Sequence, residues 1–187
     1  MQLRLLPTGL FSHSGRVMDA DFAAHAWQND QRIAELTGLP FSDAYRQNVL
    51  GAYGQPFDSA AMTEALTAVF LTAPEQELAV LSALQAARYQ QGKNLTDAAA
   101  LAEMLQQLGL PQAAQALGSQ AVRQAMAERM QQAQKLMQQF DVQGVPFCIA
   151  QLAGESLTSQ PAKAIPSSVL FGAVGDVVSN VQRLYDK

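Results

Sequence analysis

Residues 144–148 read Gly144-Val145-Pro146-Phe147-Cys148, and the spacing of apolar residues changes at this point. Helical periodicity precedes the stretch, and the apolar run that follows predicts a strand over 147–151. A proline that begins a strand after a flexible glycine is a natural place for a cis peptide bond. Only about 5–6% of X-Pro bonds in folded proteins are cis, so residue type alone favours an ordinary trans proline here.

Most of the sequence before Gly144 has apolar residues at helical spacing, separated by turn and capping residues. The spacing predicts helices over 19–35, 42–50, 58–70, 74–89, 96–108, 111–117 and 119–140. The longest carries Met126, Met130 and Met137 on its apolar stripe, and this period is typical of core packing rather than of a soft-metal site. Its other face is rich in glutamine, which predicts a solvated surface.

Strand signals stand near both ends of the sequence. Residues 2–6 alternate apolar and polar side chains, so a short strand is predicted there. After the strand at 147–151, Gly154 predicts a hairpin turn, and 156–164 predicts a second, weaker strand because a proline limits its pairing. A last helix is predicted over 175–185.

The composition indicates one globular domain over 1–187, because 49% of the residues are hydrophobic and 15% are charged. Twelve basic and sixteen acidic residues give a net charge of −4, which argues against a nucleic-acid surface. No window approaches the roughly 18–20 apolar residues of a transmembrane helix. The N-terminus does not have the pattern of a signal peptide. We therefore expect a cytoplasmic protein with no nucleic-acid or membrane partner.

The cysteine and histidine content limits the chemistry. Cys148 is the one cysteine, so an internal disulfide, a C-x-x-C redox pair and a cysteine-rich zinc site are excluded in this sequence. We interpret Cys148 as a small core hydrophobe, the usual role of a free cysteine. His13 and His25 are too few for a histidine metal cluster. We interpret His13 as a solvated loop residue and His25 as a packing or surface residue, and we expect no metal and no cofactor.

Four stretches, taken in order, resemble the DsbA-like branch of the thioredoxin superfamily, in which a helical insertion splits a thioredoxin fold. Residues 32–41, 86–97 and 101–110 resemble the early, middle and later helices of that insertion. Gly144–Cys148 resembles the loop of glycine, valine and proline whose proline is cis in that family. The resemblance covers roughly Leu3 to Leu184 and implies a helix-rich α/β protein, with a thioredoxin-like sheet and a large helical insertion.

The resemblance implies three parts. These are a strand and loop over 1–10, a mainly helical insertion with the following long helix over 19–140, and the cis-proline loop, hairpin and C-terminal helix over 141–187. In the family, a first strand and a helix with C-x-x-C precede the second strand, which Leu3–Leu10 resembles. This sequence has neither, so we expect the N-terminal βα unit to be missing.

The missing strand would lie between strands 2–6 and 147–151, and its loss would leave two unpaired edges. Three explanations are open. The sequence begins too late, a partner chain fills the slot, or the remaining strands pair directly. We therefore expect a homo-oligomer or a missing N-terminal segment.

The functional expectation also follows from the resemblance. It implies a DsbA-family thiol–disulfide oxidoreductase homologue that is redox-inactive as it stands, because the dithiol is absent. Val145 and Pro146 are the expected substrate-binding residues, since the family pairs extended peptides with this loop. Two alternatives are open: a non-redox binding or interaction protein that holds a peptide or small molecule on the same scaffold, and a relative of glutathione-dependent isomerases.

Overall fold

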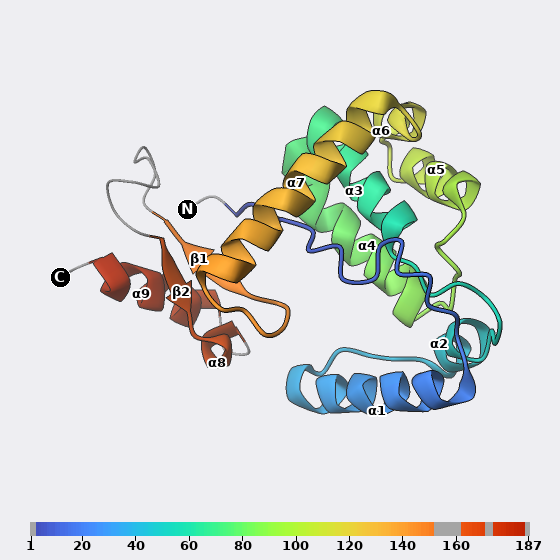
Figure 1. Ribbon diagram of the computed structural model, residues 1–187, viewed down its shortest axis with the longest axis horizontal. Coiled ribbons are helices and arrows are strands. Elements are labelled where there is room, and N and C mark those ends of the chain that lie inside the picture. The colour runs from blue at the N-terminus through green and yellow to red at the C-terminus, as the bar shows by residue number, and fades with distance from the viewer. Residues whose placement is uncertain (1–2, 152–161, 171–173, 186–187) are drawn as a thin grey trace. The chain divides into compact units, whose positions relative to one another are not determined.

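The computed structural model describes residues 3–151, 162–170 and 174–185 (Figure 1). The chain divides into two compact units, Met1–Gln134 and Lys135–Lys187. The single domain predicted over 1–187 remains a prediction. In the described residues, no helix is both long and apolar enough to cross a bilayer.

The first unit is built from helices. Its elements are α1 (Ala20–Thr37), α2 (Asp43–Tyr45), the π-helix η1 (Arg46–Leu50), α3 (Ala60–Thr72), the 3-10 helix η2 (Pro74–Gln76), α4 (Glu77–Tyr89), α5 (Ala98–Gln107), α6 (Pro111–Ala116) and α7 (Gln120–Gln139), whose last turn reaches into the second unit. The second unit contains β1 (Cys148–Ala150), β2 (Lys163–Ile165), α8 (Ser167–Leu170) and α9 (Val174–Tyr185).

The helices begin where the capping residues predict them. The side chains of Asp19, Ser42 and Asp97 each accept a hydrogen bond from a backbone N–H in the first turn of α1, α2 and α5. Such caps satisfy donors that have no partner inside the helix. The predicted helices are confirmed, with two differences. The helix expected over 74–89 begins with the 3-10 helix η2 before α4. The helix expected over 42–50 is an α-helical turn followed by the π-helix η1.

Two hydrophobic clusters form the core of the first unit. The larger one joins α3, α4, α5, α6 and α7 through buried alanine, valine and leucine side chains, among them Val69, Leu84, Leu105 and Val122. The smaller one contains Met18, Ala23, Tyr45, Val49 and Leu50, and aromatic rings pack around it. α1 contributes a single buried residue, Ala23, so most of this helix remains partly or fully exposed.

The strand predicted over residues 2–6 is wrong for its described part. Residues 3–9 form no helix, strand, turn or bend. A strand requires a ladder of backbone hydrogen bonds. The described part of the chain offers residues 3–6 no such ladder, and the carbonyl of Leu5 instead accepts from the side chain of Arg129.

The strands of the second unit are short. β1 and β2 form an antiparallel two-stranded sheet with Cys148 opposite Ile165, Ile149 opposite Ala164 and Ala150 opposite Lys163. The strand predicted over 147–151 is therefore confirmed at its centre. The turn at Gly154 and most of the predicted strand 156–164 lie outside the described residues.

Candidate functional site

The loop that precedes β1 is the first candidate site. It leaves α7 at Phe140 and Asp141, and the ring of Phe140 lies 6.1 Å from that of Phe147. The Val145–Pro146 peptide bond is cis. Val145 is 48% exposed and Pro146 is also exposed. The structure thus brings the two expected substrate-binding residues together at the surface, directly before the strand.

The backbone of Val145 has no internal partner. Within the described ranges, neither its N–H nor its carbonyl makes a hydrogen bond, and the ladder with β2 begins three residues later at Cys148. An exposed, unpaired N–H and C=O on one residue can pair with the backbone of an extended peptide. The loop therefore offers one donor and one acceptor beside a short strand.

Side chains of the sheet and of α9 form hydrogen bonds that hold the two together. The hydroxyl of Tyr185 donates to the carbonyl of Ala150 at 2.7 Å. The ammonium of Lys163 donates to the carbonyl of Leu184 and lies 4.7 Å from the centre of the Tyr185 ring. Ala150 and Ile165 are buried. Both strands are thus fixed from one side by the last turn of α9.

Cys148 follows the loop as the first residue of β1. Its thiol is free and half-buried. Burial raises the pKa of this thiol above its usual value. Because the thiolate is the nucleophilic form, a raised pKa leaves Cys148 mostly protonated and weakly reactive near neutral pH. This arrangement agrees with the interpretation of Cys148 as a small hydrophobe.

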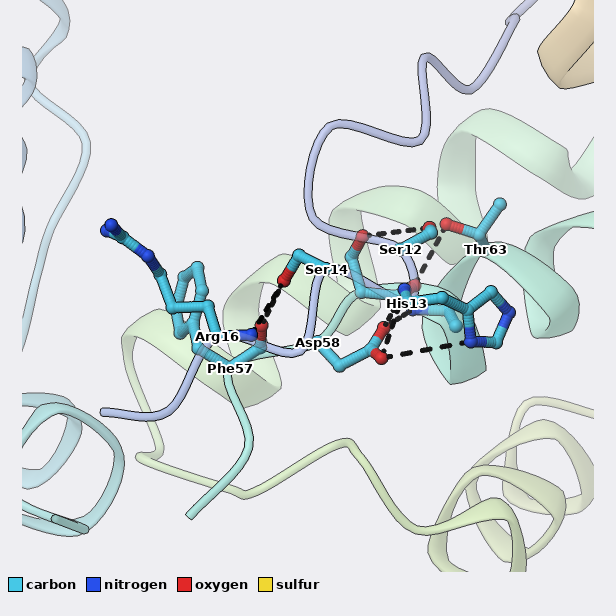
Figure 2. A network of polar contacts seen from close by, with 9 residues as sticks. Ser12, His13, Ser14, Arg16, Phe57, Asp58 and Thr63 are labelled. Carbon is cyan, nitrogen blue, oxygen red and sulfur yellow. Dashed lines mark hydrogen bonds and ion pairs between the residues drawn. The ribbon is translucent and has the colours of Figure 1, made fainter. Parts of the chain in front are cut away.

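A second polar cluster lies in the first unit, around the loop that follows Gly9 (Figure 2). Both carboxylate oxygens of Asp58 accept from the backbone N–H of His13, at 3.2 and 3.1 Å, and Asp58 also accepts from the N–H of Ala60, the first residue of α3. The hydroxyls of Ser12 and Ser59 lie 3.2 Å apart. These bonds hold His13 in a left-handed conformation with φ 54°.

This cluster fixes a turn and has no catalytic geometry. The imidazole of His13 is 74% exposed, and its Nδ1 lies 4.0 Å from the Asp58 carboxylate, which is beyond hydrogen-bond distance. Figure 2 shows the side chains of His13 and Arg16 pointing away from each other. Arg16 instead stacks over the Phe22 ring at 4.3 Å. The interpretation of His13 as a solvated loop residue is confirmed.

A buried ion pair in the first unit was not predicted from the sequence. The guanidinium of Arg129 on α7 pairs with the carboxylate of Glu77 on α4, and both side chains are less than one-tenth exposed. Arg129 also donates to the hydroxyl of Thr67 at 3.2 Å and to the carbonyl of Leu5 at 2.9 Å. Its remaining nitrogen, Nε, is buried without a partner. This guanidinium therefore connects α7, α3, α4 and the N-terminal segment.

A second buried network surrounds Asp30 on α1. The hydroxyl of Tyr45 donates to the Asp30 carboxylate at 2.9 Å. Burial raises the pKa of Asp30, although the Tyr45 hydrogen bond and the charge of Arg88 act in the opposite direction. Arg88 is 7% exposed and lies over the rings of Tyr45, Phe57 and Tyr89 at 5.4 to 6.0 Å. The network ties α1 to α2 and α4.

His25 and the remaining acidic residues do not form a metal site. His25 lies on the exposed side of α1, and its Nε2 is 3.0 Å from the side-chain amide of Asn29. This surface position is one of the two expected for it. Across the described parts of the chain, no three His, Cys, Asp or Glu side chains are grouped so that they could hold a metal ion.

Comparisons with known proteins agree with this architecture. The fold is similar to the cytosolic disulfide reductase DsbM from Pseudomonas aeruginosa, with a TM-score of 0.81 and 23% identity over 97% of this chain and 84% of that chain. The structure of DsbM with GSH matches with a TM-score of 0.75, 23% identity and coverage of 97% and 83%. A candidate protein disulfide isomerase from Nitrosomonas europaea matches with a TM-score of 0.68, 18% identity and coverage of 92% and 76%.

No curated protein sequence matches the chain closely enough to name a relative. A model of the DSBA-like thioredoxin domain matches residues 27–172, which is most of the chain. That match confirms the helix-rich, thioredoxin-like fold with a helical insertion that the sequence motifs predict. The chain therefore belongs to the family of DSBA-like thioredoxin domains.

Proposed function

We propose that this chain is a thiol–disulfide oxidoreductase homologue that binds extended peptides at the loop before β1 and performs no dithiol exchange of its own. The family match supports the scaffold, and the loop supports the binding. The observation that carries the proposal is the free backbone of Val145, exposed directly ahead of a strand.

Recognition by this loop would be strand addition. The N–H of Val145 would donate to a peptide carbonyl, and its carbonyl would accept from a peptide N–H. Main-chain bonds of this kind give affinity for any extended segment, and side-chain contacts supply the selectivity. Pro146 has no N–H, so it adds no donor beside Val145. The exposed side chain of Val145 and the ring of Pro146 would form an apolar margin for the bound segment.

The redox part of the proposal rests on Cys148. In thiol–disulfide exchange, a thiolate attacks a substrate disulfide, one sulfur leaves as a thiolate, and a second thiol resolves the mixed disulfide that remains. This sequence has one cysteine, and burial raises the pKa of its thiol. The chain alone therefore offers only a weakly reactive thiol for the attack and no second thiol for the resolving step.

A small thiol peptide is the second candidate ligand. One of the similar solved structures is DsbM with GSH, and this favours glutathione as a ligand for the same scaffold. Glutathione has peptide groups that can pair with Val145 in the way described above. Glutathione binding without turnover would fit a non-redox binding protein. A glutathione-dependent isomerase is the remaining alternative, and it would need a reactive side chain beyond those found at the loop.

A cytoplasmic location is part of the same proposal. The similar DsbM is described as cytosolic, and the single cysteine of this chain fits a compartment where thiols stay reduced.

The test is catalysed disulfide reduction with insulin as substrate, using the wild-type chain and the Cys148→Ser variant with dithiothreitol or glutathione as the reductant. Both proteins should give the rate of the reductant alone. Turnover by the wild-type chain that is lost in Cys148→Ser would overturn the redox part of the proposal and make Cys148 a nucleophile. A Ser168→Ala variant, altered at an exposed position, is the matched control for any loss of rate that a substitution causes through purification or stability rather than through the thiol.

A further inference from the structure

A groove of about 320 Å³ lies between α5 and residues 93–95 of the segment that connects α4 to α5. Local hydrogen bonds hold this segment in place. The N–H of Lys93 donates to the carbonyl of Ala87 at 2.9 Å. The hydroxyl and the N–H of Thr96 both donate to the side-chain oxygen of Asn94, at 3.0 and 3.3 Å. Ligand pockets commonly have volumes of about 300–1,000 Å³, so the groove suits a small molecule.

The backbone of Leu95 is buried at this groove without a partner. Leu95 is 2% exposed and belongs to the larger core cluster, and it also lines the groove. Among the residues that the structure describes, neither its N–H nor its carbonyl forms a hydrogen bond. About 90% or more of the buried backbone N–H and C=O groups in folded proteins are paired with protein or with water. This donor and this acceptor therefore require a partner, and the groove is the open space beside them.

Two opposite charges also line the groove without being paired to each other. The side chains are those of Lys93 and Glu103, and both residues are exposed. Within the described ranges, neither charge belongs to an ion pair, and the ammonium of Lys93 has no hydrogen-bond partner. The carboxylate of Glu103 accepts from the side-chain amide of Gln107 at 3.1 Å, through one of its two oxygens. The groove therefore presents one available cation and one available carboxylate oxygen.

The rest of the groove wall on α5 is apolar. Ala100 and Met104 are half-buried, and their spacing relative to Glu103 places all three on one face of the helix. Met104 packs against the larger core cluster. Because a methionine side chain is unbranched and flexible, it adapts to apolar groups of different shapes. The groove thus combines a charge of each sign, an unpaired backbone and an apolar wall.

We propose that this groove binds a short zwitterionic peptide, with its carboxylate at Lys93, its ammonium at Glu103 and a peptide group paired with the backbone of Leu95. A peptide group supplies one C=O and one N–H, which are the two partners that Leu95 lacks. A simple anion or cation would satisfy one charged residue of the groove and be repelled by the other, whereas a zwitterion satisfies both. An apolar side chain of the peptide would contact Met104. The inference is independent of peptide binding at Val145.

The experiment is an NMR titration of the full chain with the dipeptide alanyl-leucine, followed through the backbone amide shifts. The amides of residues 93–95 and of α5 should shift with one saturable binding curve, and the amide of Leu95 should shift most. Acetyl-alanyl-leucine lacks the ammonium, and alanyl-leucinamide lacks the carboxylate. Each should bind about threefold more weakly than alanyl-leucine, because it loses one charge pair.

Two variants assign each ligand charge to its residue. Lys93→Met should weaken the binding of alanyl-leucine by about threefold, and it should bind alanyl-leucinamide as the wild type does, because that ligand has no carboxylate to lose. Glu103→Gln should likewise weaken alanyl-leucine and leave acetyl-alanyl-leucine unchanged. Glu128→Gln is the matched control for the carboxylate, because Glu128 is exposed on α7 and also accepts from a glutamine side chain four residues away. Lys135→Met, at another exposed position of α7, is the control for the ammonium.

The absence of a shift at the Leu95 amide with alanyl-leucine would overturn the proposal. Equal binding of the three dipeptides would also overturn it, and so would equal losses in the groove variants and in their controls. Free leucine tests the peptide group, because it keeps both charges but has no amide to pair with Leu95. It should bind more weakly than alanyl-leucine, and equally tight binding would contradict pairing with the backbone of Leu95.

Discussion

Arg129 on α7 donates from its guanidinium to the backbone carbonyl of Leu5, which lies 124 residues earlier in the sequence. The same nitrogen pairs with Glu77 on α4. A buried charge requires a partner and further hydrogen bonds to offset its desolvation. The ion pair supplies the partner, and the carbonyl of Leu5 is one of the further acceptors. The position of the N-terminal segment therefore depends on a charge pair between two helices.

Removing one member of this pair should strongly destabilise the first unit. Glu77→Gln leaves the guanidinium of Arg129 buried without a counter-charge, and we expect the free energy of unfolding to fall by about 3 kcal/mol or more. Urea unfolding followed by circular dichroism measures the change. Glu75→Gln is the matched control, because Glu75 is exposed on the preceding turn, and its effect should stay within about 0.5 kcal/mol. Equal effects of the two changes would contradict the role of the pair.

Replacing both members should restore part of the loss. The double variant Glu77→Leu with Arg129→Met leaves no uncompensated charge, so its unfolding free energy should lie well above the value expected from adding the single losses. The same urea experiment on the four proteins gives the coupling between the two side chains. Additive losses would show that the charges act independently.

Asp30 should give the stability a distinct pH dependence. Burial raises the pKa of Asp30 in the folded chain, so between its usual and raised values the folded state binds more protons than the unfolded state. The free energy of unfolding should therefore fall as pH rises through that interval. Asp30→Asn removes the group and should flatten this part of the curve. Urea unfolding at a series of pH values tests this, and parallel curves for the two proteins would contradict it.

Cys148 should react slowly with alkylating reagents. Burial raises the pKa of its thiol, and the thiolate is the reactive form, so its alkylation rate at neutral pH should fall below that of free cysteine. The rate should climb as pH rises and should approach the free-thiol value in denaturing urea. Mass spectrometry of iodoacetamide-treated protein measures the rate. A folded-state rate equal to that of free cysteine at neutral pH would refute the prediction.

Gly92 should tolerate a side chain less well than Gly109. Both have a left-handed backbone, at φ 65° and 77°. A Cβ on Gly92 would lie 2.5 Å from the backbone of Ala44, whereas one on Gly109 would meet open space. Gly109→Ala should cost about 1 kcal/mol from backbone strain, and Gly92→Ala more than about 3 kcal/mol because the clash adds to that strain. Thermal unfolding distinguishes them, and equal costs would contradict the close approach.

Much of the architecture could be predicted from local sequence. Capping residues such as Asp19 and Asp97 fix where helices begin, and the apolar period fixes which face is buried. The strand at residues 2–6 could not be predicted correctly in this way. Alternation shows that a segment is suited to a sheet, but a strand also needs a neighbour, and the described chain supplies none for residues 3–6.

The candidate sites were only partly predictable. The resemblance of Gly144–Cys148 to the family's loop of glycine, valine and proline identified the loop, whereas residue type alone favours an ordinary trans proline there. The buried network of Arg129 and Glu77 was missed, since charged residues are normally solvated. A signal was present in the sequence. Arg129 lies seven residues after Val122 on the apolar stripe of α7, and Glu77 lies three residues before Val80 on that of α4. Tertiary partners decide whether such a charge is buried.

Peptide binding at Val145 is the central claim, and amide chemical shifts measured by NMR during titration with glutathione or an extended cysteine-containing peptide test it most directly. We predict that the shift changes centre on Val145, Phe147 and Cys148. Val145→Ala should weaken binding only slightly, because it keeps the backbone donor and loses part of the apolar margin. Val145→Pro should bind at least about tenfold more weakly, because it removes that donor. Shift changes confined to other parts of the chain, or no change with either probe in the wild-type protein, would contradict the account.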